Sequence, residues 1–296
     1  MKNAVLVKCR SFHYSSEGEE VLKNFDFNLE YGKVALLSGV SGCGKSTLLS
    51  LINGIIPRVT PGLFDGEILI DGEDIKSKSM SQISRKVGSV LQNAESQIIN
   101  QTVEDEIAFG CENFGFEPSL IATQIDKSCS LMQIQKEWKT RTLSGGQKQR
   151  VVTASTLAMN GDILIFDEPL ANLDGEGAVI LLKLLQGLAA KGKAVLLVEH
   201  RLDVALPYAD IVWNLKDGRV EKVRNKKEFL KSQSNIIKSG GKLENAVDYD
   251  TALLLTGIKK KFGSREILRG IDLEIKKGER ILLTGENGCG KSTLMS

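Results

Sequence analysis

The sequence is poor in cysteine and histidine, and those it has do not form a recognisable framework. Its five cysteines, Cys9, Cys43, Cys111, Cys129 and Cys289, include no CxxC pair and no metal-ligand spacing with either of the two histidines. Such a pattern argues against a disulfide scaffold and against a structural zinc site. A reducing cytosol is the compartment that fits best.

Charge imbalance and long apolar runs are also missing. Thirty-nine basic residues against thirty-seven acidic residues leave a net charge of +2, which gives no electrostatic footprint for nucleic acid or for an anionic membrane. The apolar run near the N-terminus is too short for a signal peptide. The longest apolar runs, such as AVLLV at 194–198, fall far short of the roughly 20 residues that a membrane span needs. A protein of this kind would act on a membrane only from outside the bilayer.

What the sequence does contain is an internal repeat. GVSGCGKSTLLS at 39–50 is nearly identical to GENGCGKSTLMS at 285–296, with Lys45 aligned on Lys291 at an offset of 246 (291 − 45). The agreement extends upstream at the same offset, because VLKNFDFNLEYGKVALLSG at 21–39 matches ILRGIDLEIKKGERILLTG at 267–285. A period of this size is that of a whole domain and is too long for a solenoid repeat. The pattern therefore predicts one complete copy followed by the beginning of a second.

Hydrophobic patterning predicts an α/β fold. Alternating Phe25, Phe27 and Leu29 indicate a half-buried strand, and VALLS, ILIF and AVLLV indicate buried strands. A helix should begin near Lys45, and residues 93–160 have helical spacing with few strand signals. Strands separated by helices are typical of an α/β sheet. We expect a complete domain over 1–225, a polar linker over 226–250 and a fragment of a second domain over 251–296.

Both glycine-rich stretches satisfy the pattern GxxxxGK[ST] of a P-loop. Its glycines let backbone N–H groups approach phosphates, its lysine reaches the β and γ oxygens, and its hydroxyl holds Mg²⁺. We expect nucleotide binding at Gly39, Ser41, Gly42, Cys43, Gly44, Lys45, Ser46 and Thr47. The corresponding residues of the second copy are Gly285, Gly290, Lys291, Ser292 and Thr293. Cys43 lies beside a helix N-terminus, an environment that lowers a thiol pKa and favours the reactive thiolate. A small filler residue is the expected role of Cys43, and a reactive thiol is the alternative.

The stretch ILIFDEP ends a predicted buried strand with two carboxylates. In a phosphoryl-transfer site Asp167 would hold Mg²⁺ and Glu168 would lie near the attacking water. A helix cap after a strand is the alternative. Glu168 can act as general base only if it lies within hydrogen-bond reach of that water.

LSGGQKQR at 143–150 makes a family resemblance specific. Ser-Gly-Gly before a helical run is also an ordinary helix N-cap, but with the P-loop and the Asp-Glu pair it resembles the signature of ABC-type ATPases. The resemblance spans residues 1–225 and implies ATP hydrolysis with Mg²⁺. It implies a P-loop domain with an antiparallel β subdomain, a mixed or parallel core sheet and a helical subdomain. The signature residues are Leu143, Ser144, Gly145, Gly146 and Gln147.

In that family the signature binds the γ-phosphate of ATP held by a facing domain, so two nucleotide domains must meet. The resemblance places Asp174, within ANLD, in the loop that crosses between them. It implies that Gln92 contacts Mg²⁺, together with Ser46 and Asp167, and that His200 senses the γ-phosphate. A polar strand end is the alternative for His200.

The family also places an aromatic ring against adenine about where Tyr14 stands, 25 residues before Gly39 (39 − 14). Phe12 is a possible substitute for it. Core packing is the alternative for either ring.

A narrower resemblance lies inside the first. LQNAESQIINQTVEDEIAFGCEN at 91–113 and VEHRL at 199–203 resemble the ATPase subunits of energy-coupling factor importers, which take up vitamins, cobalt or nickel. Such subunits lie on the cytoplasmic face of the membrane and bind a membrane coupling subunit, which joins a substrate-binding membrane subunit. Leu170 and Asn172 depart from the family's usual residues after Asp-Glu-Pro.

The second copy carries binding residues without catalytic ones. Phe262 matches Tyr14 and Lys291 matches Lys45, but no second signature, Asp-Glu pair or switch histidine follows in 251–296. We expect this segment to be a poorly ordered or aggregation-prone tail, because so few residues rarely bury a core of their own. The first P-loop would then find its partner signature by homodimerisation or in another ATPase subunit. A catalytically impaired fragment, or an ABC protein outside transport, are the alternative functions.

Overall fold

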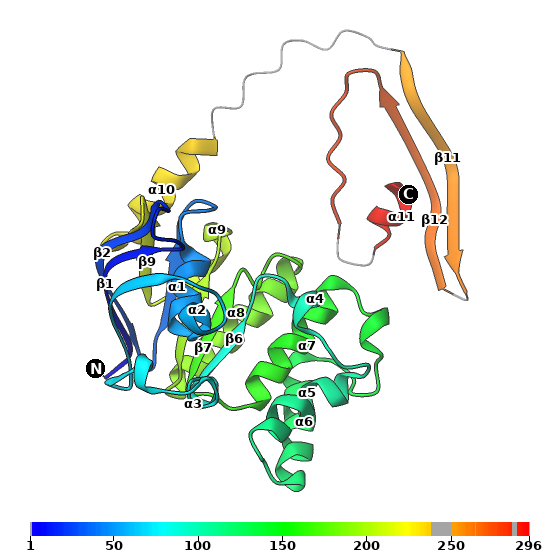
Figure 1. Ribbon diagram of the computed structural model, residues 1–296. Coiled ribbons are helices and arrows are strands. Elements are labelled where there is room, and N and C mark those ends of the chain that lie inside the picture. The colour runs from blue at the N-terminus through cyan, green and yellow to red at the C-terminus, as the bar shows by residue number, and fades with distance from the viewer. Residues whose placement is uncertain (1, 238–249, 264, 286–288, 296) are drawn as a thin grey trace. The chain divides into compact units, whose positions relative to one another are not determined.

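The computed structural model describes residues 2–237, 250–263, 265–285 and 289–295 (Figure 1). The chain divides into two compact units, Met1–Gln233 and Ser234–Ser296. The division falls within the segment that we expected to be a linker. In the described residues no helix is both long enough and apolar enough to cross a membrane.

The first unit begins with an antiparallel sheet. Its strands follow the order β2-β1-β4-β5 and are β1 (Asn3–His13), β2 (Glu20–Glu30), β4 (Leu63–Ile70) and β5 (Glu73–Asp74). Along β2 the predicted alternation holds, because Phe25, Phe27 and Leu29 are all buried. Successive side chains of a strand point to opposite faces, so this sheet has one apolar face.

A second sheet forms the centre of the unit. Its order is β10-β9-β3-β8-β7-β6, parallel except for the edge strand β10. The strands are β3 (Val34–Ser38), β6 (Val87–Val90), β7 (Ile163–Asp167), β8 (Ala194–Val198), β9 (Ile211–Lys216) and β10 (Arg219–Lys222). All residues of β3, β7 and β8 are buried, as expected for parallel strands covered on both faces.

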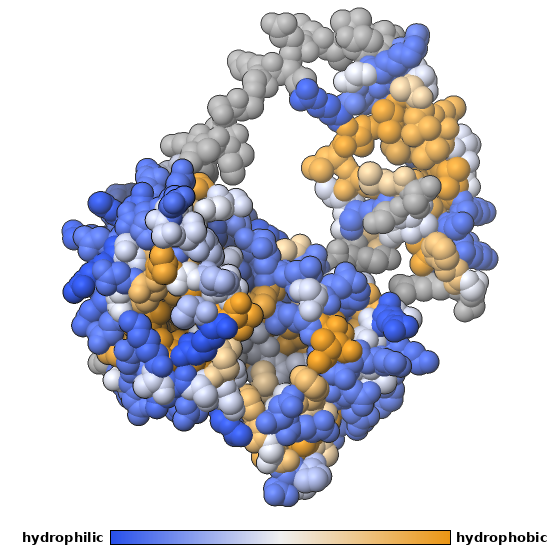
Figure 2. Space-filling view, in the orientation of Figure 1, coloured by the Kyte–Doolittle hydropathy of each residue, from blue (hydrophilic) through white to orange (hydrophobic). Residues whose placement is uncertain are grey.

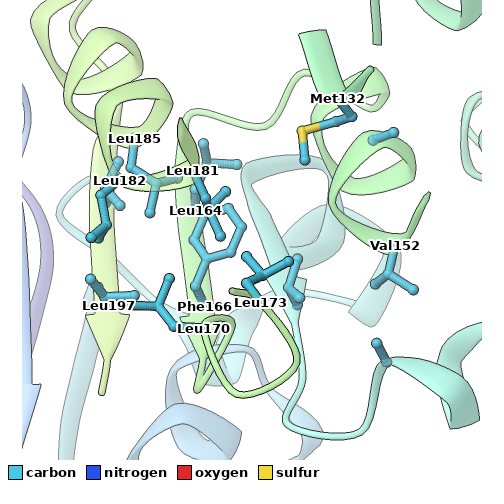
Figure 3. Packing of buried hydrophobic residues seen from close by; sticks show 14 of the residues in the cluster. Met132, Val152, Leu164, Phe166, Leu170, Leu173, Leu181, Leu182, Leu185 and Leu197 are labelled. Atoms are coloured by element: carbon cyan, nitrogen blue, oxygen red, sulfur yellow. The ribbon is translucent and has the colours of Figure 1, made fainter. Parts of the chain in front are cut away.

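Alternate residues of these strands contribute to two different cores. Leu36 and Phe166 belong to the core shared with the helices, whereas Leu37 and Ile165 belong to the core shared with the antiparallel sheet and α1. Figure 3 shows Leu164 and Phe166 facing leucines of α8, with Leu170 and Leu173 beside them. The central sheet is therefore a rigid layer between two apolar layers.

Ten α-helices are described in or next to this unit, and three 3₁₀ turns accompany them. The helices are α1 (Lys45–Ile52), α2 (Ile55–Arg58), α3 (Met80–Lys86), α4 (Ala94–Gln97), α5 (Val103–Asn113), α6 (Pro118–Met132), α7 (Gly145–Ala158), α8 (Gly175–Ala190), α9 (Leu202–Ala205) and α10 (Lys226–Ile237). The turns are η1 (Ile75–Ser77), η2 (Thr140–Thr142) and η3 (Leu206–Tyr208). Helices α5, α6 and α7 pack together in one group (Figure 1). The expected helical subdomain over 93–160 is confirmed, as is the α/β fold with its antiparallel and mixed sheets.

The segment 226–250 differs from its expected structure over its first half. Helix α10 covers Lys226–Ile237, and its Phe229 and Leu230 pack against the helix-side core of the first unit. We expected a linker because the segment is mostly polar. Phe229 and Leu230, which are adjacent in one helical turn, nevertheless supply enough apolar surface to pack. Residues 238–249, including Gly240 and Gly241, lie outside the described residues.

The second unit contains a long antiparallel hairpin and a short helix. These are β11 (Thr251–Phe262), β12 (Arg265–Lys276) and α11 (Lys291–Met295). Residues 280–284, which match β3 in sequence, form no strand, and the side chains of Ile281, Leu282 and Leu283 are exposed. In the described part of this unit, the two strands of the hairpin form the whole sheet.

Candidate functional site

The first P-loop joins the end of β3 to the start of α1. Gly44 is the N-cap of α1 and has φ +105°, a conformation that only glycine adopts without strain. A Cβ atom on Gly39 would lie 2.4 Å from the carbonyl oxygen of Leu215. All eight predicted nucleotide-binding residues, from Gly39 to Thr47, therefore lie in one loop and the first turn of its helix. A helix N-terminus presents free N–H groups, which suits phosphate.

The lysine of this loop is drawn back over it. Lys45 Nζ donates hydrogen bonds of 2.9 Å to the carbonyl oxygens of Gly39 and Val40, and the residue is 6% exposed. These bonds hold the ammonium group above the loop, where the predicted phosphates would lie. A triphosphate would exchange two neutral acceptors for charged ones, which make stronger hydrogen bonds.

Two of the predicted magnesium ligands are already in contact. Ser46 Oγ donates to Asp167 Oδ2 at 3.0 Å, which joins the first turn of α1 to the end of β7. Burial raises the pKa of Asp167, and the hydrogen bond from Ser46 opposes that shift. A hydroxyl and a carboxylate are hard oxygen donors, and Mg²⁺ in proteins is commonly held by one or two carboxylates together with substrate phosphates. The residues present therefore fit Mg²⁺ bound with a nucleotide.

The three predicted catalytic residues meet at one carboxylate. Gln92 Nε2 donates to Glu168 Oε2 at 3.1 Å, and His200 Nε2 lies 2.9 Å from Glu168 Oε1. They meet because β6, β7 and β8 are parallel neighbours, so the segments that follow them emerge at the same edge of the sheet. The sequence predicted the three residues separately, and only the strand order brings them together.

The backbone at Glu168 is strained. Its φ is +51°, which costs a non-glycine residue about 1–2 kcal/mol. Its N–H is held by the carbonyl oxygen of Val198 at 2.9 Å. Such conformations persist only where the surrounding structure enforces them, and they cluster at functional sites.

The two aromatic candidates for the adenine contact are separated by burial. Phe12 is fully buried, whereas Tyr14 is 47% exposed and donates or accepts a 2.8 Å hydrogen bond with Thr47 of the P-loop. Phe12 packs edge-on against Tyr14, with the ring centroids 4.9 Å apart. Phe12 is thus a support for the Tyr14 ring, and only Tyr14 offers a face to a base.

The signature residues cap their own helix. Ser144 is the N-cap of α7, with its Oγ accepting from Gln147 N while Gln147 Oε1 accepts from Ser144 N. Asp174 likewise caps α8 by accepting from Gly177 N at 2.8 Å. Among the described residues of the first unit, no hydrogen bond or ion pair joins 143–147 to 39–47. The fold leaves both groups on separate elements, so their predicted roles in a facing domain stay predictions.

Of the two roles considered for Cys43, the structure favours the small filler residue over the reactive thiolate. Burial raises the pKa of the Cys43 thiol, and the neighbouring Lys45 ammonium offsets this only in part. The sequence indicated a helix N-terminus but gave no measure of how much water the loop excludes. Cys43 is therefore a small neutral side chain in the loop at neutral pH.

At its described residues the second P-loop shares two features with the first. Gly290 has φ +101°, and Lys291 Nζ donates to the carbonyl oxygen of Gly285 at 2.7 Å. Thr293 lies in α11. The side chain of Ser292 lies outside the described residues.

Two residues of the first unit have contacts that the sequence did not predict. Glu199 is 2% exposed, and its carboxylate accepts hydrogen bonds from backbone N–H groups on both sides of the site. Arg201 donates to the carbonyl oxygens of Leu170 and Leu173. The sequence does show Glu199 and Arg201 on either side of His200 in VEHRL. It could not show their partners, because these lie in a different loop.

Comparison with known proteins gives one family over most of the first unit. The model of the ABC transporter family matches residues 22–171 and 268–296. A protein of Treponema denticola named for ABC transporter ATP binding is 34% identical over 303 residues, covering 96% of this chain and 62% of its own length. A protein of Methanosarcina mazei with the same name is 33% identical, and the alignment covers 99% of this chain and 61% of that protein. The chain thus spans about three fifths of the length of these curated relatives.

Solved structures with the same fold include isolated cassettes and a dimer. The structure of cbiO1 from Clostridium perfringens, described as part of the ABC transporter complex cbiONQ, has a TM-score of 0.69 and 30% identity, covering 80% of this chain and 94% of that one. A dimeric structure of the bacterial ABC transporter cassette MJ0796 has a TM-score of 0.65 and 26% identity, and the match covers 75% of this chain and 99% of that one. The same cassette was also solved in a post-hydrolysis state with ADP and Pi.

Proposed function

Because this chain belongs to the ABC transporter family, whose cassettes bind and hydrolyse ATP with Mg²⁺, we propose that it energises a membrane importer of the energy-coupling factor type. The observation that supports hydrolysis most strongly is the convergence of Gln92 and His200 on Glu168. The observation that supports this type of importer is the likeness to cbiO1, which comes from a cbiONQ complex.

The P-loop and Tyr14 bind the nucleotide. The base stacks on the exposed Tyr14 ring, and the triphosphate lies along the free N–H groups of 39–47 and the N-terminus of α1. Lys45 turns from its two loop carbonyls to the phosphates. Ser46, Asp167 and Gln92 hold Mg²⁺, which supplies positive charge against the phosphate oxygens. Lys45, Ser46, Gln92 and Asp167 already lie at the carboxyl edge of the central sheet, where α/β folds bind their ligands.

Glu168 takes the proton of the attacking water. Its two carboxylate oxygens are each held by a different side chain, so the carboxylate has one orientation before any water is aligned. A general base within hydrogen-bond reach of its proton contributes about 10²- to 10⁴-fold to a rate.

A second cassette completes the site. The signature residues 143–147 lie at the N-terminus of α7, an anion-binding position, but on a different element from the P-loop of the same unit. They therefore bind the γ-phosphate of ATP in a facing cassette, and Asp174 lies in the loop between the two. The dimeric MJ0796 structure supports this arrangement. The partner is either a second copy of this chain or another ATPase subunit.

A groove beside Gln92 receives the membrane coupling subunit, which in turn binds the substrate-binding membrane subunit. It has a volume of about 360 Å³ and lies between α3, α5 and α7, with Met80, Phe109, Phe114 and Met159 among its lining residues. Phe109 is 44% exposed. Since the groove also includes Leu91, next to Gln92, a helix seated in it would reach the site directly. In this proposal the protein is a peripheral subunit on the cytoplasmic face of the membrane.

Replacing Glu168 with Gln tests hydrolysis. Phosphate release from ATP by the purified chain should fall about 10²- to 10⁴-fold, whereas retention of ATP with magnesium should persist because the amide keeps the shape of the side chain. Asp210→Asn is the matched control, because Asp210 accepts Val34 N at 2.8 Å at the opposite edge of the sheet. Phosphate release that is unchanged in Glu168→Gln would show that the assignment is wrong.

Phe109→Asp tests the coupling groove. The charge should abolish co-purification of membrane subunits from detergent-solubilised membranes, because an apolar helix cannot bury an unpaired carboxylate. Phosphate release by the isolated chain should remain. If the membrane subunits remain bound to the variant, the groove is not their docking site.

A further inference from the structure

The loop that follows Glu168 is bound at its main chain by the two residues that flank His200. Glu199 Oε1 accepts from Leu170 N at 2.8 Å. Arg201 Nη1 donates to the carbonyl oxygen of Leu170 at 3.2 Å and to that of Leu173 at 3.2 Å. Both polar main-chain groups of Leu170 are therefore held by side chains that adjoin His200 in sequence.

Glu199 also binds its own segment. Its second oxygen, Oε2, accepts from His200 N at 3.2 Å. One carboxylate thus joins the backbone of His200 to the backbone of Leu170. The carboxylate is 2% exposed, and water cannot replace either bond without opening the core.

The side chains of the bound loop are fixed as well. Leu170 is fully buried and Leu173 is 9% exposed. Figure 3 shows both beside Phe166 and Leu197, in the core between the central sheet and α8. Leu170, a departure from the family's usual residue, therefore anchors the loop by its side chain while Glu199 and Arg201 hold its main chain.

This loop connects two functional groups. It begins at Glu168, whose Oε1 lies 2.9 Å from His200 Nε2, and it ends at Asp174, the N-cap of α8. His200 is thereby joined to the loop in two ways. Its ring contacts Glu168, and its backbone N–H binds the Glu199 carboxylate, which also binds Leu170 N. A shift of 170–174 cannot occur without moving the backbone that carries His200.

Burying a carboxylate disfavours its charged form, so such a group needs a reason to be retained. Burial raises the pKa of Glu199, and hydrogen bonds from the backbone of Leu170, Arg201 and His200 oppose that shift. These are the same contacts that join the two segments. A neutral side chain of equal length would supply only one acceptor oxygen for N–H groups that approach from two sides.

We propose that Glu199 and Arg201 are positioning residues that lock the loop 170–173 to the segment of His200, so that the dimer-facing Asp174 and the hydrolytic Glu168 keep one relative arrangement. This inference rests on the proposed ATPase function. The lock acts on hydrolysis and leaves nucleotide binding to the P-loop. Its loss therefore lowers kcat while KM for ATP is kept.

The test compares Glu199→Gln, Arg201→Met and Arg201→Lys with the wild type in steady-state ATP hydrolysis. Glu199→Gln and Arg201→Met should lower kcat about 10- to 100-fold, as loss of an orienting partner does, with KM within about 2-fold. Arg201→Lys keeps a donor for the two carbonyl groups and should restore most of kcat. Asp210→Asn, which removes a carboxylate acceptor of a backbone N–H far from the site, should leave both constants unchanged.

Hydrogen exchange of the nucleotide-free protein gives a second readout that does not depend on activity. The amides of 170–174 should exchange faster in Glu199→Gln than in the wild type, but not in Asp210→Asn. Unchanged exchange of these amides, or an unchanged kcat in Glu199→Gln, would overturn the proposal. If the wild type releases no phosphate, the proposed function fails, and the exchange result alone still decides whether the lock exists.

Discussion

The two glycine-rich loops of this chain have nearly the same sequence and agree in the backbone features described for both, but their surroundings differ greatly. Gly44 and Gly290 have φ angles of +105° and +101°, and each lysine donates to the carbonyl oxygen of its first glycine, at 2.9 Å and 2.7 Å. Leu36 and Leu282 occupy equivalent positions (282 − 36 = 246) just before the loops, and they are 0% and 85% exposed. Local sequence is thus enough for the loop and insufficient for the strand that precedes it.

The physical reason lies in strand pairing. In the first unit β3 is bonded to β8 on one side and β9 on the other. The described residues of the second unit offer residues 280–284 no such neighbours, and a lone strand leaves its backbone groups unpaired. Its hairpin also shows large apolar side chains, among them Leu254 and Phe262, at the surface (Figure 2). A sequence that forms a buried strand in one place is exposed chain in another.

The largest effect that would sharpen this comparison is on stability. Leu36→Ala should cost about 2–5 kcal/mol, the usual range for truncating a buried leucine, because Leu36 packs between the sheet and the helices. Leu282→Ala should leave the free energy of unfolding of the first unit unchanged, because an exposed side chain loses no packing. Urea unfolding monitored by circular dichroism measures both. Equal losses in the two variants would mean that residue 282 is buried in solution.

A smaller effect is expected on nucleotide affinity. Lys45→Ala should weaken ATP binding about 10- to 100-fold, because a hydrogen bond to a charged group is worth about 1.5–3 kcal/mol. Lys291→Ala should change total ATP retention by less than about 2-fold, since the described residues 280–284 before its loop are not paired in a sheet that would hold the loop against a phosphate. Equilibrium dialysis with labelled ATP and magnesium compares them. A larger loss of ATP binding in Lys291→Ala than in Lys45→Ala would mean that the second loop, not the first, is the main nucleotide site.

The candidate site was predictable where residue type and order suffice. The P-loop, Asp167 and Glu168 follow from local motifs, and the α/β alternation followed from apolar runs. The sequence left alternatives open where burial decides between them. Cys43 has a raised thiol pKa because the loop excludes water, and Phe12 is unavailable to a base because it is enclosed in the core. Burial depends on residues far away in the sequence, which no local pattern reports.

The sequence by itself determined the phosphate-binding loop, because glycines at left-handed positions and a lysine at fixed spacing act within one turn. In the first unit the apolar runs also indicated the buried strands β3, β7 and β8, since such runs need cover on both faces, whereas the similar run at 281–283 is exposed. Only the tertiary structure decided that Gln92 and His200 meet at Glu168, and that Glu199 reaches Leu170. Those contacts depend on strand order, and the order of parallel strands is set by how the whole sheet packs between its two layers.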